Sequence, residues 1–95
     1  MHAVIRRYSG EGAAQLFDEL ERHRGELEPL LRGVPGFVAY TLTRTAEGGL
    51  SVTVCQDKTG TDESVRIAGE WIRKNTTASA SPPQVSEGDV ILQLS

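Results

Sequence analysis

The segment GVPGFVAY, residues 33–40, constrains the fold more than any other stretch of the chain. It joins the end of an amphipathic helix to the start of a strand. Pro35 and Gly36 suit the two central positions of a type II turn, and Gly33 suits the cap of the preceding helix. Together with strand-like segments at both ends of the chain, this junction predicts the order strand, helix, strand, strand, helix, strand.

The first helix is predicted over about residues 12–33, where apolar side chains recur every three or four positions. Gly25 and Pro29 lie inside this stretch. A helical proline clashes with the carbonyl four residues back, and here that residue is the pliable Gly25. We therefore expect one helix with a kink centred on 25–29.

The second helix is predicted to begin at Thr61, because a hydroxyl side chain is a good N-cap. Asp62 and Glu63 then follow at the positive end of the helix dipole. The inner stripe of this helix is expected to consist of Val65, Ala68 and Ile72, with Ile67 and Trp71 on its flank.

Four segments alternate or are rich in β-branched and aromatic residues, which is typical of strands. A hairpin is expected at 46–49, and a long loop of small residues and prolines at 76–88. The predicted strands cover residues 2–8, 37–45, 50–57 and 89–94.

Side-chain parity predicts the register of the central hairpin. Pairing Leu42 with Val52 would gather the larger apolar side chains on one face, which should then pack against the helices. This face would contain Val38, Tyr40, Leu42, Val52 and Val54. The opposite face, better suited to close approach of another surface, would contain Ala39, Thr41, Thr43, Ser51, Thr53 and Cys55.

Two βαβ units within 95 residues are typical of a ferredoxin-like α+β plait, with a four-stranded antiparallel sheet and both helices on one face. We expect residues 1–95 to form a single domain. So small a domain has no further element to cover the other face of its sheet. A homodimer that stacks sheet on sheet would cover it, so we expect the chain to associate with itself.

Composition argues against several classes of partner. The net charge of −3 disfavours nucleic acid and anionic membrane surfaces, which attract basic faces. No apolar run approaches the roughly 20 residues of a membrane span. With one cysteine, an internal disulfide cannot form, and no secretory signal pattern is present at the N-terminus. We therefore expect a cytoplasmic protein.

Three aromatic residues are candidates for a ligand pocket between helix and sheet. Tyr40 and Trp71 could line it, with Tyr8 at its mouth, because aromatic side chains with a polar tip are typical of cavity edges. The alternative is that they fill the core. Cys55 is a further candidate, although a lone cysteine within a strand is more typical of a small buried hydrophobe.

His2 and His23 are the only histidines, and no further ligands stand at a spacing that would complete a metal site with them. The sequence therefore predicts no metal. Glycine pairs such as 48–49 lack the lysine and the strand-to-helix context of a phosphate-binding loop. No cofactor of the protein's own is predicted.

From Leu30 through Tyr40, and again over Ser51–Asp57 and Glu63–Asn75, the chain resembles the antibiotic-biosynthesis-monooxygenase-like, or dimeric α+β barrel, superfamily. The likeness is clearest to an uncharacterised bacterial branch and covers nearly the whole chain. Characterised relatives oxidise quinols or aromatic polyketides, or degrade haem, with an Asn, a Trp and a His in one pocket. Here the first strand has no Asn and the helix after the hairpin has no His.

The resemblance implies a dimer with a pocket for a small aromatic molecule, in which oxidation would need no cofactor. Two functions follow from the sequence. One is a monooxygenase-like pocket protein, suggested by the fold pattern with Tyr40 and Trp71. The other is a non-catalytic structural or partner-binding dimer, suggested by the missing Asn and His.

Overall fold

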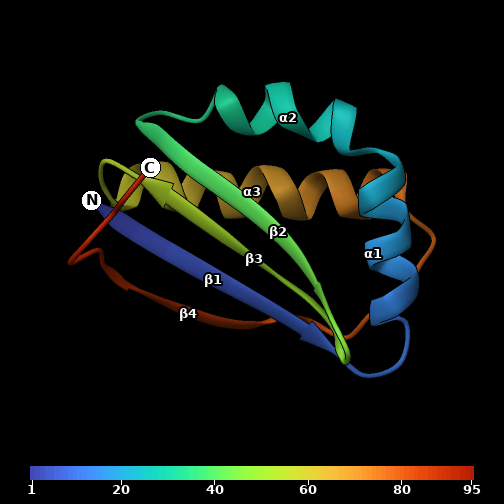
Figure 1. Ribbon diagram of the computed structural model, residues 1–95. Helices are drawn as coiled ribbons and strands as arrows, with labels where there is room; N and C mark the ends of the chain where they lie inside the picture. The colour runs from blue at the N-terminus through green and yellow to red at the C-terminus, as the bar shows by residue number, and fades with distance from the viewer.

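The computed structural model describes residues 1–95 and shows an antiparallel four-stranded sheet with three helices packed on one face (Figure 1). The strand order β2-β3-β1-β4 is that of a ferredoxin-like plait, so the predicted α+β fold is confirmed. The elements in chain order are β1 (His2–Ser9), α1 (Ala13–Arg22), α2 (Arg24–Arg32), β2 (Phe37–Thr45), β3 (Gly48–Cys55), α3 (Lys58–Asn75) and β4 (Gln84–Asp89).

The predicted helix over 12–33 is two helices, and the prediction of a kink at 25–29 is wrong. The break lies at His23, and Pro29 sits inside α2 without ending it. A straight helix of this length would span roughly 33 Å, as much as the longest extent of the whole molecule, 33 Å. The break turns α2 steeply away from α1, so that both helices cover the sheet (Figure 1).

The Pro-Gly turn forms as predicted. The Phe37 N–H donates to the carbonyl of Val34, and Gly36 has a φ of 69°, which favours glycine. Its Cα also faces the Gln56 side chain, where an added Cβ would lie 3.1 Å away. The turn therefore places the start of β2 beside the end of β3.

The predicted hairpin register is wrong by one residue. Leu42 pairs with Ser51, and Tyr40 pairs with Thr53. The face that packs against the helices therefore combines the large side chains of β2 with small side chains of β3, because the helices approach β3 closely. The ring of Phe17 lies so near Gly49 that an added Cβ would come within 2.2 Å of it.

The exposed face of the sheet is consequently more apolar than expected. Threonines of β2 point to this face as predicted, but on β3 the apolar residues join them instead of the small polar ones. Ile5, Leu50 and Val52 are only half-buried within the single chain. The residues that share this face on β1, β2 and β3 are Ala3, Ile5, Arg7, Ala39, Thr41, Thr43, Leu50, Val52 and Val54.

The helix α3 begins earlier than predicted, after Asp57 rather than at Thr61. The Asp57 carboxylate accepts hydrogen bonds from the N–H groups of Thr59 and Gly60, at 3.0 and 3.4 Å. This satisfies two of the donors that a helix start leaves free. Thr61 is instead buried in the first turns of the helix.

The last strand also differs from prediction. β4 forms within the expected loop, at Gln84–Asp89, where its backbone pairs with β1. The segment predicted as a strand, 89–94, lies almost wholly beyond it, because β4 already occupies the edge of β1. Ile91, Leu92 and Leu94 are 97%, 74% and 79% exposed.

The core lies between the helices and the sheet. Its largest wholly buried side chain is Leu16, and all three helices contribute residues to the cluster. None of the helices is both long and apolar enough to cross a membrane. The cluster consists of Tyr8, Ala13, Leu16, Phe17, Leu20, Leu27, Leu31 and Trp71.

Candidate functional site

The largest hollow of the molecule is a groove between α2 and β2, which we call the α2–β2 groove. Its volume is about 460 Å³, within the range of small-molecule sites. Leu27 and Leu31 of α2 form one wall, and Tyr40 and Leu42 of β2 form the other. Charged side chains of Arg24, Glu28 and Arg32 also border the groove. The groove is therefore apolar with charged groups beside it.

A small inner void lies between the sheet and the helices, and Leu27, Tyr40 and Leu42 border both spaces. Its volume of about 10 Å³ is near the least that holds one water molecule. Arg6 and Ser51, paired across β1 and β3, form its polar side. The void is thus mostly apolar, with the polar groups of Arg6 and Ser51 on one side.

Arg6 is 7% exposed, yet no aspartate or glutamate forms an ion pair with it. Its guanidinium donates to the Tyr8 hydroxyl and lies 5.5 Å from the centre of the Tyr8 ring. The buried Nε atom has no hydrogen-bond partner. Ser51 Oγ is also buried and unpartnered, beside the Tyr40 phenol but outside hydrogen-bonding geometry.

The two tyrosines of the site are held neutral. Burial raises the pKa of Tyr8 and of Tyr40 above the ordinary value of 10.0, and the positive charge of Arg6 offsets part of that rise. Both phenols can therefore donate hydrogen bonds to a bound molecule at neutral pH. Neither is poised to act as a phenolate base.

We expect the folded protein to lose stability as the pH rises above about 10. Because the buried phenols of Tyr8 and Tyr40 ionise at higher pH than free tyrosine, the folded state there binds more protons than the unfolded chain. Phenolate absorbance in the near ultraviolet, followed against pH with and without denaturant, reports only these two residues, since the chain has no other tyrosine. The Tyr8→Phe variant isolates Tyr40. Equal titration midpoints in both states would contradict the expectation.

Of the four residues proposed from sequence as pocket candidates, the structure brings together Tyr8 and Tyr40, which both line the inner void. Trp71 lies elsewhere. It is 8% exposed and packs edge-on against His23, with 5.6 Å between ring centres. It borders a separate shallow hollow between α2 and α3, next to Leu30 and Asn75. The indole thus helps to hold α3 beneath the helix break.

Cys55 is wholly buried at the end of β3, beneath the first turn of α3. Burial raises the pKa of its thiol, and the Asp57 carboxylate raises it further. A thiol in this environment stays protonated at neutral pH and is a poor nucleophile. Its position is that of a small packing residue.

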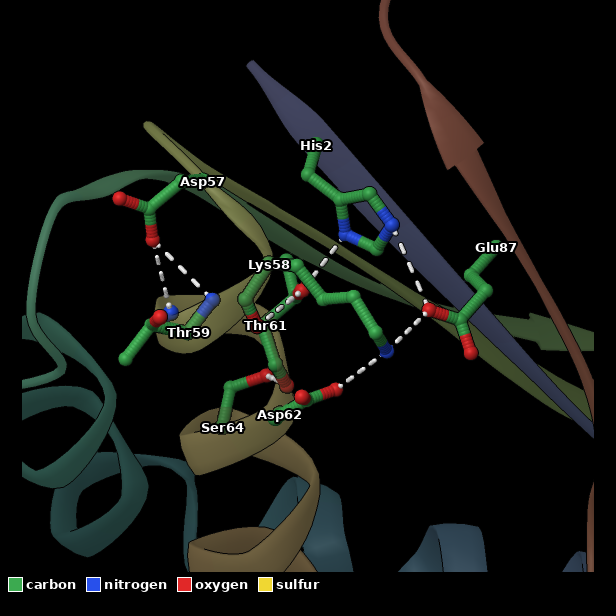
Figure 2. A network of polar contacts seen from close by, with 9 residues as sticks. His2, Asp57, Lys58, Thr59, Thr61, Asp62, Ser64 and Glu87 are labelled. Atoms are coloured by element: carbon green, nitrogen blue, oxygen red, sulfur yellow. Dashed lines mark hydrogen bonds and ion pairs between the residues drawn. The ribbon is translucent and has the colours of Figure 1, made fainter.

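His2 belongs to a polar network that joins β1, α3 and β4 (Figure 2). Its Nδ1 lies 2.6 Å from Thr61 Oγ1, and its Nε2 lies 3.3 Å from the Glu87 carboxylate. Lys58 Nζ bridges Glu87 and Asp62 at 2.8 and 2.9 Å. No three His, Cys, Asp or Glu side chains gather closely enough to hold a metal ion. The network therefore fastens the edge strand β4 to the body of the fold.

Sequence reasoning missed Arg6 and Ser51. A signal for Arg6 was present, because it alternates in phase with Val4 and Tyr8 and so had to share their face of the strand. For Ser51 the predicted register placed the side chain on the wrong face. The observed pairing of β1 with β3 places Ser51 directly opposite Arg6.

Comparisons with family models and with curated proteins found no match for this chain. Solved structures do match it. A protein of unknown function from Nitrosomonas europaea has 17% identity and a TM-score of 0.68, with 98% of this chain and 90% of that one covered. The haem degrader MhuD from Mycobacterium tuberculosis has 19% identity and a TM-score of 0.67, with 100% of both chains covered.

The monooxygenase ActVA-Orf6 from Streptomyces coelicolor, solved with nanaomycin D, has 17% identity and a TM-score of 0.59. Its match covers 97% of this chain and 91% of that one. The chain has the antibiotic-biosynthesis-monooxygenase-like fold. The resemblance predicted from sequence is thereby confirmed at the level of the fold. Within this fold, two inward residues of β1, Arg6 and Tyr8, line the inner void.

Proposed function

We propose that the protein is a homodimer that binds a small aromatic molecule in the α2–β2 groove. The observation that carries the proposal is the groove itself: an apolar hollow of about 460 Å³ with the unpartnered polar groups of Arg6 and Ser51 beneath it. Apolar walls with a few convergent polar groups are typical of small-molecule sites. The phenol of Tyr40 borders both spaces and can donate a hydrogen bond to the ligand.

Oxidation of the bound molecule, as in a monooxygenase, is the activity that we propose for this site. Structural neighbours of this fold include a monooxygenase and a haem degrader, which supports the choice of reaction class. The proposed oxidation uses no cofactor of the protein's own, so the ligand itself supplies the electrons that reduce O₂. An electron-rich phenol or quinol meets this requirement.

A non-catalytic dimer is the alternative function, and one observation favours it. The inner void beneath the groove has a volume of about 10 Å³, so the core around Tyr8 and Arg6 is closely packed. In that case Tyr40 and Leu42 would fill space, and the exposed face of the sheet would be the functional surface. The two functions differ in whether any ligand enters the groove.

The homodimer is supported by two features of the single chain. Ile5, Leu50 and Val52 form an apolar strip on the exposed face of the sheet. Beyond Val90, whose N–H still bonds to the carbonyl of Met1, the tail 91–94 has exposed aliphatic side chains and lies outside every strand of its own chain. A second copy would bury both features.

A binding and turnover experiment with 2-naphthol and anthrone tests the proposed function. We expect either compound to shift backbone NMR signals of α2 and β2, and oxygen consumption to accompany binding. Leu42→Gln should weaken binding about tenfold, because it places an amide in the apolar wall. Leu30→Gln is the matched control, since Leu30 is 42% exposed on α2 and does not line the groove.

Binding without oxygen uptake would restrict the function to a binding module. Shifts confined to the exposed face of the sheet, with equal affinities for Leu42→Gln and wild type, would show that the groove is not the site.

A further inference from the structure

The inner end of the proposed site carries a positive charge that the fold leaves uncompensated. Arg6 is nine-tenths buried, has no acidic partner, and retains an Nε–H without an acceptor. Its single side-chain hydrogen bond goes to a neutral hydroxyl, that of Tyr8. Buried charges in folded proteins are normally paired, because removing an unpaired charge from water is costly. The missing partner is therefore an anion.

A second polar group without a hydrogen-bond partner, the hydroxyl of Ser51, belongs to the lining of the same void. Ser51 is 3% exposed, and its Oγ has no hydrogen-bond partner. Ser51 faces Arg6 directly across β1 and β3, and both side chains line the inner void. The hydroxyl of Ser51 and the Nε–H of Arg6 are both able to donate. Two buried donors without acceptors on neighbouring strands form a site for an oxygen anion.

The groove provides the access to this pair of donors. The inner void and the α2–β2 groove share Leu27, Tyr40 and Leu42 as walls. The void itself holds no more than about one water. An acidic group would replace that water once the Tyr40 ring turned aside, while the apolar body of the ligand stayed in the groove. Arg24 and Arg32 beside the groove are paired with Glu21 and Glu28, so the attraction for such an anion would come mainly from Arg6.

We propose that the ligand of this protein is an organic anion, an apolar ring system carrying one carboxylate or phenolate that binds Arg6 and Ser51. This inference rests on the proposed function, because it specifies the ligand of the same groove. Arg6 and Ser51 act as binding residues that choose an acidic ligand over a neutral one of equal shape.

The test compares 2-naphthoate with its uncharged isostere 2-naphthamide, by titration of the purified full chain. We expect the carboxylate to bind ten- to a hundredfold more tightly, as for hydrogen bonds to charged groups. Arg6→Met should remove this preference, because it weakens binding of the carboxylate far more than binding of the neutral amide. Arg24→Met, at the edge of the groove, is the matched control and should keep most of the preference. The same titration with a nitro-substituted naphthol, which is ionised at neutral pH, shows whether a phenolate is bound as tightly as a carboxylate.

Thermal unfolding provides the second readout. Because Arg6 is an unpaired buried charge in the unliganded protein, Arg6→Met should raise the melting temperature, by about 4 °C or more. A large fall in melting temperature would show that the fold already compensates Arg6, and would overturn the inference. Equal binding of 2-naphthoate and 2-naphthamide would also overturn it while leaving the groove as a ligand site. If neither compound bound, the proposed function itself would fail.

Discussion

Replacing Gly60 with alanine is expected to lower the free energy of unfolding by about 2–3 kcal/mol. An added Cβ would lie 2.2 Å from the carbonyl oxygen of Pro35 and 2.7 Å from the Cβ of Cys55. Neither atom belongs to the flexible end of a side chain, so relief requires α3 to move away from the sheet. The close approach of the first turn of α3 to β3 depends on this glycine.

Gly69→Ala is the matched control because Gly69 lies in the same helix and has no atom within 4 Å of an added Cβ. It should stabilise the protein by about 0.5–1 kcal/mol, the ordinary gain for alanine over glycine in a helix. Urea unfolding followed by circular dichroism, at one fixed protein concentration, measures both variants. Equal stabilities of the two variants would show that α3 does not pack against residues 35 and 55 as described.

Placing a glutamate at Val52 is expected to weaken the proposed homodimer at least a hundredfold. Val52 lies near the middle of the exposed face, between Ile5 of β1 and Thr41 of β2. In a single chain a carboxylate there can still reach water, because the position is only half-buried. In a sheet-on-sheet dimer it would be buried without a partner, at a cost of several kcal/mol. Each 1.4 kcal/mol is about a tenfold change in the dissociation constant.

The control is Ala14→Glu, which adds the same charge at an exposed position of α1, away from this face. Sedimentation equilibrium over a range of concentrations measures the dimer of each variant. Circular dichroism should show the same secondary structure in Val52→Glu as in wild type. A wild-type protein that stays monomeric at all concentrations, or a Val52→Glu dimer of unchanged strength, would contradict the dimer on this face.

The candidate site was only partly accessible to sequence reasoning. Tyr8 and Tyr40 could be proposed because aromatic residues with a polar tip are typical of pocket edges, and the structure places both on the inner void. Trp71 satisfied the same pattern but lies against His23 instead. Which aromatic residues converge depends on how the helices cross the sheet, and periodicity along the chain does not contain that information.

Local physics, readable in the sequence, determined the type and order of the elements. Alternation predicted β1 and β2, apolar spacing predicted the helical regions, and the Pro35-Gly36 turn required a reversal between helix and strand. These features act over a few residues, through backbone sterics and the burial of one side of an element. They therefore hold wherever the element finally packs.

Tertiary packing alone decided the register of β3, the break at His23 and the position of β4. Hydrophobicity favoured turning Val52 and Val54 toward the helices, yet the helices pack so closely on β3 that only small side chains such as Gly49 and Ser51 fit beneath them. Leu50 and Val52 were thereby left half-buried on the opposite face, and Ser51 was brought beside Arg6. Close packing of distant segments overrode the local pattern, because a steric clash would cost more free energy than burying a valine side chain would gain.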